Sequence, residues 1–170
     1  MKKYLFWVTL MTLVLSGCIV VDDFKQYWNK GTVDPKLEGQ WQDQGSKEPS
    51  VIFVRQEENY ALVVPNETTP SELIRTLSIG KYTFMMIKTS KEDKGGDLIR
   101  YSVEGNALKF YTPNEKKKTE FQRFYKLNAV VFDEETIRFK EINAQIISML
   151  QAVSGKPDYW ELSGTYTKVP

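Results

Sequence analysis

The chain has 170 residues, and its 23 basic and 22 acidic residues give a formal net charge of +1. A nucleic-acid-binding protein normally carries a strong basic excess, so this balance argues against a nucleic-acid partner. The sequence contains no histidine and one cysteine, Cys18, which excludes histidine-dependent catalysis and ordinary structural zinc sites. Carboxylate catalysis stays open, but most acidic residues fall in turns or on polar faces. We therefore expect no enzyme activity, no cofactor and no metal.

The N-terminal segment has the three regions of a secretory signal peptide in their usual order. Two lysines open the chain, residues 4–15 are mostly apolar, and Ser16 and Gly17 are small. An alternative interpretation is an uncleaved membrane-spanning helix, since about 20 apolar residues cross a bilayer. The small residues interrupt the apolar run and an acidic pair soon follows it, so we prefer a signal peptide over residues 1–17.

The last four residues of this region, Leu15-Ser16-Gly17-Cys18, resemble the lipobox of bacterial lipoproteins. In that family the cysteine sulfur receives a diacylglycerol and the chain is cut just before the cysteine. The resemblance implies that lipidated Cys18 is the first residue of the mature chain, which keeps 153 of the 170 residues after loss of residues 1–17. Two or more acyl chains attach a protein stably, because each buried methylene contributes about 0.8 kcal/mol.

The residues after the cysteine predict a location. In lipoproteins of the enteric type, an aspartate directly after the lipidated cysteine retains the protein at the inner membrane. Here Ile19 and Val20 follow Cys18. We expect a lipid-anchored protein on the periplasmic face of the outer membrane if the host is Gram-negative. In a Gram-positive host, we expect it on the outer face of the single membrane.

The mature chain divides into a short tether and one domain. We predict that residues 18–35 are a lipidated tether and that residues 36–170 form a single barrel domain. Tyr27 and Trp28 in the tether either cover one rim of the domain or enter the lipid interface, where both residue types are enriched. We prefer the first interpretation.

From Gly39 onward, short segments of β-like composition alternate with turns. Apolar and polar residues alternate in several of them, which is typical of strands with one buried face. The expected strands are residues 40–44, 51–54, 60–64, 73–79, 82–88, 99–103, 107–111, 121–127, 136–140 and 160–166. Such regular spacing predicts an antiparallel barrel or sandwich, and we prefer the barrel because closure removes exposed strand edges.

One late segment has a helical period instead. Its apolar residues recur at spacings of three and four, the period of an amphipathic helix: Ile142, Ile146, Met149, Leu150 and Val153. Gly155 is a suitable C-terminal stop, and a proline follows closely. We therefore expect one C-terminal α-helix over residues 141–154.

The first expected strand opens with Gly39-Gln40-Trp41, which resembles the Gly-x-Trp signature of the lipocalins and the wider calycin group. The resemblance implies a mainly all-β fold, an antiparallel lipocalin-like β-barrel of about 8–10 strands with a helix packed outside and one more strand. In that family an arginine at the end of the strand before the helix packs on the signature tryptophan. Arg138 occupies this place, so Gly39, Trp41 and Arg138 are expected to form a structural signature at the barrel floor.

Two functions fit a membrane-anchored barrel of this kind. In the first, the barrel holds a small hydrophobic ligand, because about eight strands can enclose one and lipocalin-like lipoproteins often carry hydrophobic molecules. The residues expected to face inward are Tyr82, Phe84, Met86, Tyr101, Phe110 and Tyr125. These side chains either line such a cavity or simply fill the interior.

The alternative is a structural or interaction lipoprotein that displays its barrel surface to an envelope protein or a cell-wall polymer. Lys116, Lys117 and Lys118 could meet anionic groups there, although a charge run is usually a solvated loop. Small periplasmic lysozyme-inhibitor barrels are a third candidate. We rank them last, because those barrels are typically braced by a disulfide that a chain with one cysteine cannot make.

Overall fold

A computed structural model describes residues 19–44, 50–63, 72–117, 120, 131–132 and 137–170 of the chain. The predicted signal peptide with Cys18, and the expected strand at residues 121–127 with Tyr125, lie outside the described residues. These features therefore stay predictions.

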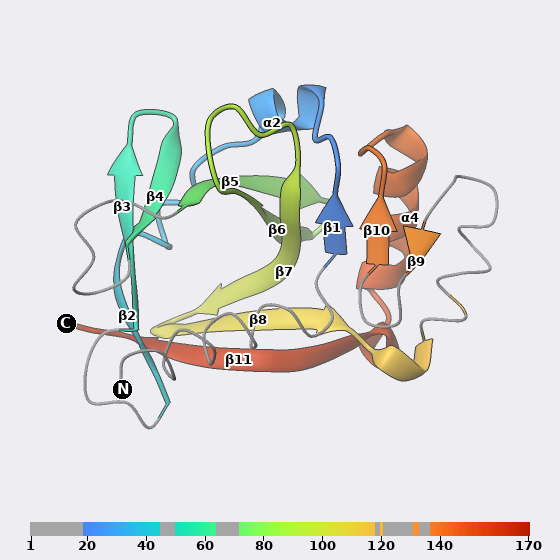
Figure 1. Cartoon of the computed structure of the whole chain (residues 1–170). Helices are drawn as coiled ribbons and strands as arrows, with labels where there is room; N and C mark the ends of the chain where they lie inside the picture. Colours follow the sequence, from blue (N-terminus) through green and yellow to red (C-terminus); the bar gives the residue numbers. More distant parts are fainter. Residues whose placement is uncertain (1–18, 45–49, 64–71, 118–119, 121–130, 133–136) are drawn as a thin grey trace, which may run out of the picture.

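Eight antiparallel strands form a closed barrel (Figure 1). Seven of them, β2 to β8, follow one another along the chain, and each pairs with the next; β11 fills the place between β8 and β2. Their bounds are β2 Gly39–Asp43, β3 Val51–Gln56, β4 Asn59–Val63, β5 Glu72–Ile79, β6 Tyr82–Lys88, β7 Gly96–Glu104, β8 Ala107–Pro113 and β11 Trp160–Lys168. The predicted fold class, a mainly all-β antiparallel barrel with one C-terminal α-helix, is confirmed.

The barrel closes in an order that the resemblance to lipocalins did not predict. β11 follows helix α4 (Ala144–Ser154) along the chain, yet it is the eighth strand of the ring and not an extra strand beside a completed barrel. It pairs with β8 over most of its length and with β2 near its end. Without β11, both β2 and β8 would have an open edge, so closure depends on the last segment of the chain.

Helix α4 begins at Ala144, three residues after the predicted start, because Asn143 caps it. The side-chain oxygen of Asn143 accepts hydrogen bonds from the backbone N–H groups of Gln145 and Ile146, at 3.1 and 3.0 Å. These bonds satisfy backbone donors that have no partner within the helix. The helix ends at Ser154, as predicted.

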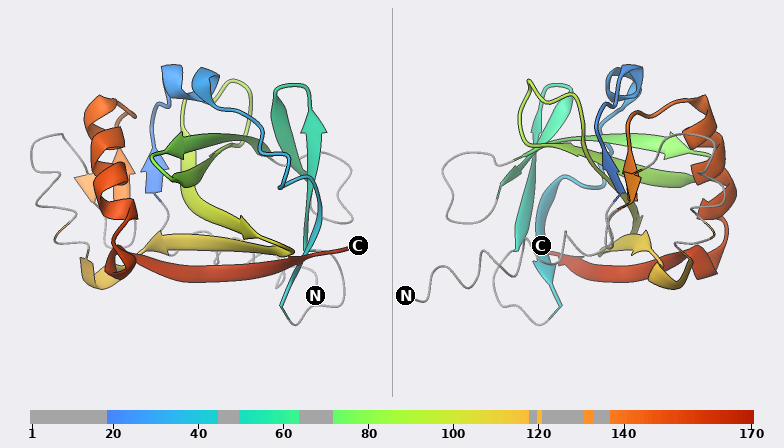
Figure 2. Two further views of the ribbon diagram at one scale, coloured as in Figure 1. Left: turned by 180° about the vertical axis from the view of Figure 1, so that it is seen from behind. Right: turned by 45° about the vertical axis from the view of Figure 1, so that its right-hand side comes forward.

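A three-stranded extension continues the sheet beyond the barrel. β1 (Ile19–Val21) pairs antiparallel with the first residues of β7 and parallel with β10 (Ile137–Phe139), which pairs with β9 (Val131–Phe132). The remaining part of the same β7 edge pairs with β8. Figure 2 shows α4 on the same side of the barrel as this extension.

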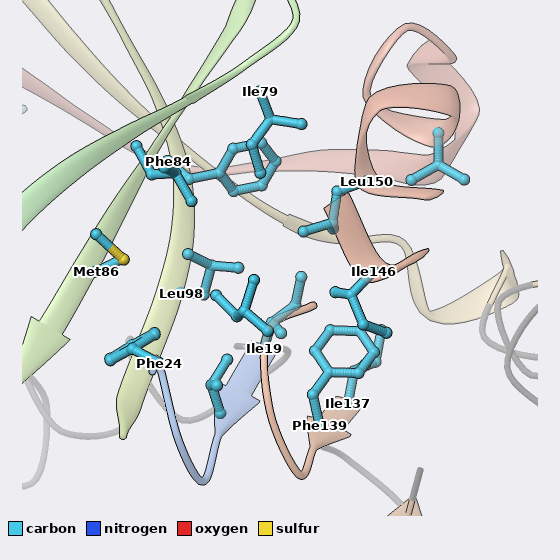
Figure 3. Packing of buried hydrophobic residues seen from close by; sticks show 14 of the residues in the cluster. Ile19, Phe24, Ile79, Phe84, Met86, Leu98, Ile137, Phe139, Ile146 and Leu150 are labelled. Carbon is cyan, nitrogen blue, oxygen red and sulfur yellow. The ribbon is translucent and has the colours of Figure 1, made fainter. Parts of the chain in front are cut away.

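Two hydrophobic cores lie on opposite faces of the barrel wall. The inner core lies inside the barrel and consists of Leu37, Trp41, Val51, Phe53, Tyr60, Ile74, Met85, Ile87, Ile99, Tyr101 and Leu108. The outer core lies between the wall and a cover made by β1, β10 and α4 (Figure 3). It consists of Ile19, Val21, Phe24, Leu77, Ile79, Phe84, Met86, Leu98, Ile137, Phe139, Ile142, Ile146, Leu150, Val153, Tyr159 and Trp160.

The segment that we expected to be a tether, residues 18–35, is part of the fold from Ile19 onward. Ile19 and Val21 are each 1% exposed, and Phe24 is fully buried. All three side chains lie in the outer core. The folded domain therefore includes Ile19 to Phe24 and does not start at residue 36, because these apolar side chains cover an apolar face of the barrel wall.

Helix α2 (Gln26–Lys30) covers another part of the barrel wall. Tyr27 and Trp28 are partly buried there against the outer core, and the Trp28 ring stacks on the Phe24 ring with 5.9 Å between centroids. Thr32, just after α2, forms an antiparallel bridge with Thr76 of β5. These contacts favour the interpretation that the two aromatic residues cover the domain.

Trp41→Ala is expected to lower the free energy of unfolding by about 3–5 kcal/mol, because the indole is fully buried in the inner core. Urea unfolding followed by circular dichroism measures this change. Leu162→Ala is a control on a side chain that is 57% exposed, and we expect it to change stability by less than about 0.5 kcal/mol. A Trp41→Ala protein that unfolds at the same urea concentration as the parent would contradict the assignment.

Candidate functional site

Gly39 and Trp41 lie in β2, where the Gly-x-Trp signature predicts them. Trp41 Nε1 donates a hydrogen bond to the backbone oxygen of Leu37 at 2.7 Å. Lys168 of β11 pairs with Trp41 and places its Nζ 5.4 Å from the centre of the indole ring. Gly39 has a φ of +120°, and a Cβ at this position would lie 3.1 Å from Lys168 Cε. Because Gly39 has no side chain, the Lys168 side chain can pass over it and reach the Trp41 ring.

Arg138 does not supply the cation on Trp41, contrary to our prediction. Its Nε donates a hydrogen bond to Oδ1 of Asp22 at 2.7 Å, and its side chain is 53% exposed. The prediction was wrong because β10, which carries Arg138, belongs to the extension and is separated from β2 by several strands. Lys168 on the strand after α4 takes the expected place on the indole instead.

Side chains fill the barrel interior. Trp41, Tyr60, Ile74, Met85 and Leu108 are each at most 1% exposed and belong to one packed cluster. An eight-stranded barrel is just wide enough for such filling. Two aromatic residues that we predicted to face inward do so, since Tyr101 belongs to the inner core and Phe110 packs against it. Within the described residues, Phe110 and Tyr101 pack in this core, and Tyr101 also borders a polar pocket at the barrel rim.

Three residues of β6 face the other way from our prediction. Phe84 and Met86 belong to the outer core, and Tyr82 packs against it. Met85 and Ile87 take the inward positions. Because successive strand residues point to opposite faces, four consecutive apolar residues, as at positions 84–87, do not reveal which set is inside. The cover over the outer face was not part of the prediction, and it reverses the expected orientation.

The segment between α2 and β2 packs into the barrel and helps to fill it. Leu37 in this segment is fully buried in the inner core. Two tyrosines of the barrel hold it at Asp34: Tyr60 donates to the backbone oxygen and Tyr101 to the carboxylate, each at 2.9 Å. Burial raises the pKa of the Tyr101 hydroxyl, and the nearby Asp34 raises it further. The hydroxyl therefore stays protonated and keeps donating to Asp34.

A buried cation lies on the outer side of the barrel, where it has a structural role. Arg75 of β5 is 7% exposed, and each of its three nitrogens donates a hydrogen bond. The acceptors are Glu58 Oε2 at 2.7 Å, Asn59 Oδ1 at 2.8 Å and the Trp28 backbone oxygen at 3.0 Å. The Trp28 ring also lies 4.5 Å from Lys88 Nζ. Each nitrogen of Arg75 therefore has an acceptor within the protein, which fits a structural role.

Two carboxyl groups lie near the end of the inner core. Glu72 is two residues before Ile74, and Asp97 is two residues before Ile99, so both point to the same side as core residues. Burial, together with the charge of Asp97, raises the pKa of Glu72 to about 6. Burial also raises the pKa of Asp97. These groups make the stability of the barrel depend on pH.

The described residues form a polar pocket of about 350 Å³ at the rim of the barrel, next to the start of β6 and the end of β7. Its lining includes Arg100, Lys81, Ser102, Glu104, Tyr82 and Tyr111. The guanidinium of Arg100 lies between aromatic rings, and burial lowers its pKa without removing its charge. This pocket was not predicted, since its residues come from separate strands with no common motif.

A second polar pocket, of about 310 Å³, lies beside α2. Its charged lining consists of Arg55, Arg75, Glu57 and Glu58, so basic and acidic groups are equal in number. Arg75 and Glu58 pair directly. This balance gives the pocket no preference for ligands of either charge.

The lysine run at residues 116–118 is partly engaged within the protein. Lys116 is exposed. Lys117 Nζ pairs with Glu120 Oε1 at 2.7 Å and lies 5.6 Å from the Tyr159 ring centre. Lys118 lies outside the described residues. This part of the chain therefore gives less free positive charge than the run suggests.

Two further features can be stated for the described part of the chain. It contains no helix that is long and apolar enough to span a bilayer. It also contains no group of three or more cysteine or acidic side chains arranged to hold a metal ion.

In comparisons with known proteins, no family model, no curated protein and no solved structure matches the chain. The lipobox and Gly-x-Trp resemblances therefore depend on the residues quoted for them. The functional proposals below depend on the geometry of this chain.

Glu72→Gln is expected to stabilise the protein at about pH 7.5 by roughly 1–2 kcal/mol and to have little effect below about pH 4.5. A raised pKa means that the folded state favours the protonated carboxyl group, so the parent loses stability as pH rises from 4.5 through about 6. Glutamine carries no charge at any pH and avoids this loss. Urea unfolding of both proteins across this pH range measures the difference.

Glu92→Gln, at an exposed loop position, is the matched control and should show no such pH-dependent difference from the parent. A Glu72→Gln effect of equal size at both ends of the pH range would contradict the burial of an ionisable Glu72.

Proposed function

We propose that this chain is a membrane-anchored, non-catalytic envelope lipoprotein that is held through a lipid on Cys18 and acts through the outer surface of its barrel. The lipobox resemblance of Leu15-Ser16-Gly17-Cys18 supports the anchor. The packed inner core supports the choice of the surface over the interior. The partner is an envelope component that lies at the same membrane.

The observation that carries the proposal is the burial of Ile19, the residue directly after Cys18. Ile19 is 1% exposed and pairs with Leu98 of β7 on one side and Ile137 of β10 on the other. Consecutive Cα atoms are about 3.8 Å apart, so a lipid on Cys18 would be joined to the sheet through a single peptide unit. Such an anchor would contain no flexible spacer, so it would hold the barrel against the membrane surface.

The filled interior also bears on the alternative function, the carriage of a small hydrophobic ligand. Pockets for such ligands are usually apolar cavities of about 300 Å³ or more. The two pockets described above are lined mainly by polar side chains, and of the inner core only Tyr101 takes part in the lining of the first. These observations favour an interaction lipoprotein over a ligand carrier.

Cys18→Ser is expected to release the protein from membranes, because it removes the sulfur that would receive the lipid. The parent should gain the mass of a diacylglycerol at Cys18, and globomycin should block its cleavage. Membrane fractionation and mass spectrometry of the N-terminal peptide measure both effects. Ser16→Ala keeps a small residue in the lipobox and is the control that should still be processed. An unmodified Cys18 in the parent would overturn the proposal.

A separate measurement distinguishes the surface function from the carrier function. The protein is crosslinked in intact cells and purified in an uncharged detergent. One envelope protein in stoichiometric amount would support binding through the barrel surface. A stoichiometric lipid beyond the covalent anchor, detected by native mass spectrometry, would support the carrier and overturn the surface proposal.

We further propose that the membrane is the outer membrane if the host is Gram-negative, with the barrel on the periplasmic face. Density fractionation of native membranes measures this location, and recovery in the inner-membrane fraction would contradict it. Ile19→Asp is unsuitable as a sorting test. It would place a carboxylate in the outer core between Leu98 and Ile137, and an unpaired buried charge destabilises the fold.

A further inference from the structure

The rim pocket is a notch that forms because β7 is longer than the part of it that pairs with β6. The β6–β7 pairing ends at Thr83 opposite Tyr101, while β7 continues to Glu104. The notch therefore exposes one edge of β7 from Ser102 onward. Lys81, in the turn before β6, lines the same pocket of about 350 Å³.

Aromatic rings surround the cation of this notch. The guanidinium carbon of Arg100 lies 4.5 Å from the Tyr82 ring centre, 4.7 Å from that of Tyr111 and 5.2 Å from that of Trp160. Trp160 is itself fixed, because its Nε1 donates to the backbone oxygen of Val153 at 3.1 Å. Rings close to a guanidinium stabilise its charge through cation–π attraction and do not use up its N–H donors.

The charge of Arg100 is not paired within the described part of the chain, where no carboxylate forms an ion pair with it. The nearest acidic residues of the pocket lining are occupied elsewhere. Glu104 accepts from Lys109 Nζ at 2.6 Å and from Ser102 Oγ at 3.1 Å. Asp34 accepts from Tyr101. This differs from Arg75, whose three nitrogens all have acceptors.

A tyrosine hydroxyl lines the same notch as the unpaired cation. The Tyr111 hydroxyl lies 3.4 Å from Ser102 Oγ, which donates its own proton to Glu104. Lys81 adds a second positive charge, with its Nζ 5.4 Å from the Tyr82 ring centre. A planar guanidinium, an ammonium and a tyrosine hydroxyl together match the several acceptor oxygens of a phosphate group.

The notch also lies close along β7 to the proposed anchor. Leu98 pairs with Ile19, and Arg100 is two residues further along the same strand, about 7 Å in an extended chain. Ile19 follows the cysteine that would carry the lipid. Phosphate groups of a membrane surface would therefore be available near Arg100.

We propose that the notch is a phosphate-binding site in which Arg100 is the principal ligand and Lys81 and Tyr111 assist. The bound group is the phosphate of a lipid headgroup, an assignment that rests on the proposed lipid anchor. The site itself depends on the geometry of β6, β7, β8 and β11 and of the turn before β6, so it can be tested whether or not Cys18 is lipidated.

The test uses the full processed chain in an uncharged detergent that contains no phosphate. Glycerophosphoglycerol, a soluble phosphodiester headgroup, and inorganic phosphate are titrated separately, with acetate as the control anion. Trp160 lies next to Arg100, so tryptophan fluorescence follows binding, and calorimetry measures it independently. We expect saturable binding of the phosphodiester.

Arg100→Gln is expected to weaken this binding by about tenfold to a hundredfold, because it removes a charge-assisted hydrogen-bonding group. Arg100→Lys keeps the charge without the planar fork and should bind with intermediate affinity. Arg138→Gln removes an exposed arginine of the extension and should bind as the parent does. Circular dichroism checks that each variant is folded. If the Arg100→Gln protein does not fold, Lys81→Gln tests the site in its place.

The outcomes separate the possible sources of phosphate. Saturable, Arg100-dependent binding of the phosphodiester supports the headgroup assignment. Binding of inorganic phosphate alone supports the site but overturns the headgroup as its ligand. Equal binding of acetate overturns the choice of phosphate, and no saturable binding of any anion overturns the site. None of these outcomes depends on the modification state of Cys18, which is measured separately.

Discussion

The outer face of the wall formed by β5, β6 and β7 is apolar, and much of the remaining structure follows from the need to cover it. Side chains such as Phe84, Met86 and Leu98 lie on this face. Burial of each contributes about 1.5–3 kcal/mol relative to exposure in water. The cover comes from segments that are far apart in the sequence, namely β1 near the N-terminus and β10 with α4 near the C-terminus (Figure 3). The chain must pass through this cover before β11 returns to close the barrel.

This requirement explains which parts of the fold could be predicted from the sequence. Turn residues and alternating polarity located the strands, and the three-and-four spacing of apolar residues located α4, because these patterns are local. The orientation of β6 could not be predicted from its local sequence, because residues 84–87 are all apolar. The outer cover decides that Met85 and Ile87 face inward. The place of β11 in the ring was equally hidden, because strand order is a property of the whole chain.

The candidate site was less predictable than the fold. The signature residues Gly39 and Trp41 were found, but the cation on the indole comes from Lys168 and not from Arg138. The rim pocket combines side chains from β6, β7 and β8 that have no sequence motif in common. The apolar character of Ile19 and Val21 was consistent with a strand. Their position next to a predicted signal peptide led us to assign them to a tether instead.

A short attachment and a weak phosphate site would reinforce one another. A domain joined to the bilayer through one peptide unit meets headgroups at a high effective concentration, so a contact too weak to hold a free protein can still orient an attached one. The guanidinium of Arg100 suits this role, because three aromatic rings already surround it before any ligand arrives and less side-chain freedom remains to be lost. A covalent lipid would fix one point of the domain, and the domain could still rotate about that point relative to the membrane. A phosphate contact beside the same strand would supply a second point, and two points determine which part of the barrel surface faces a partner on the membrane.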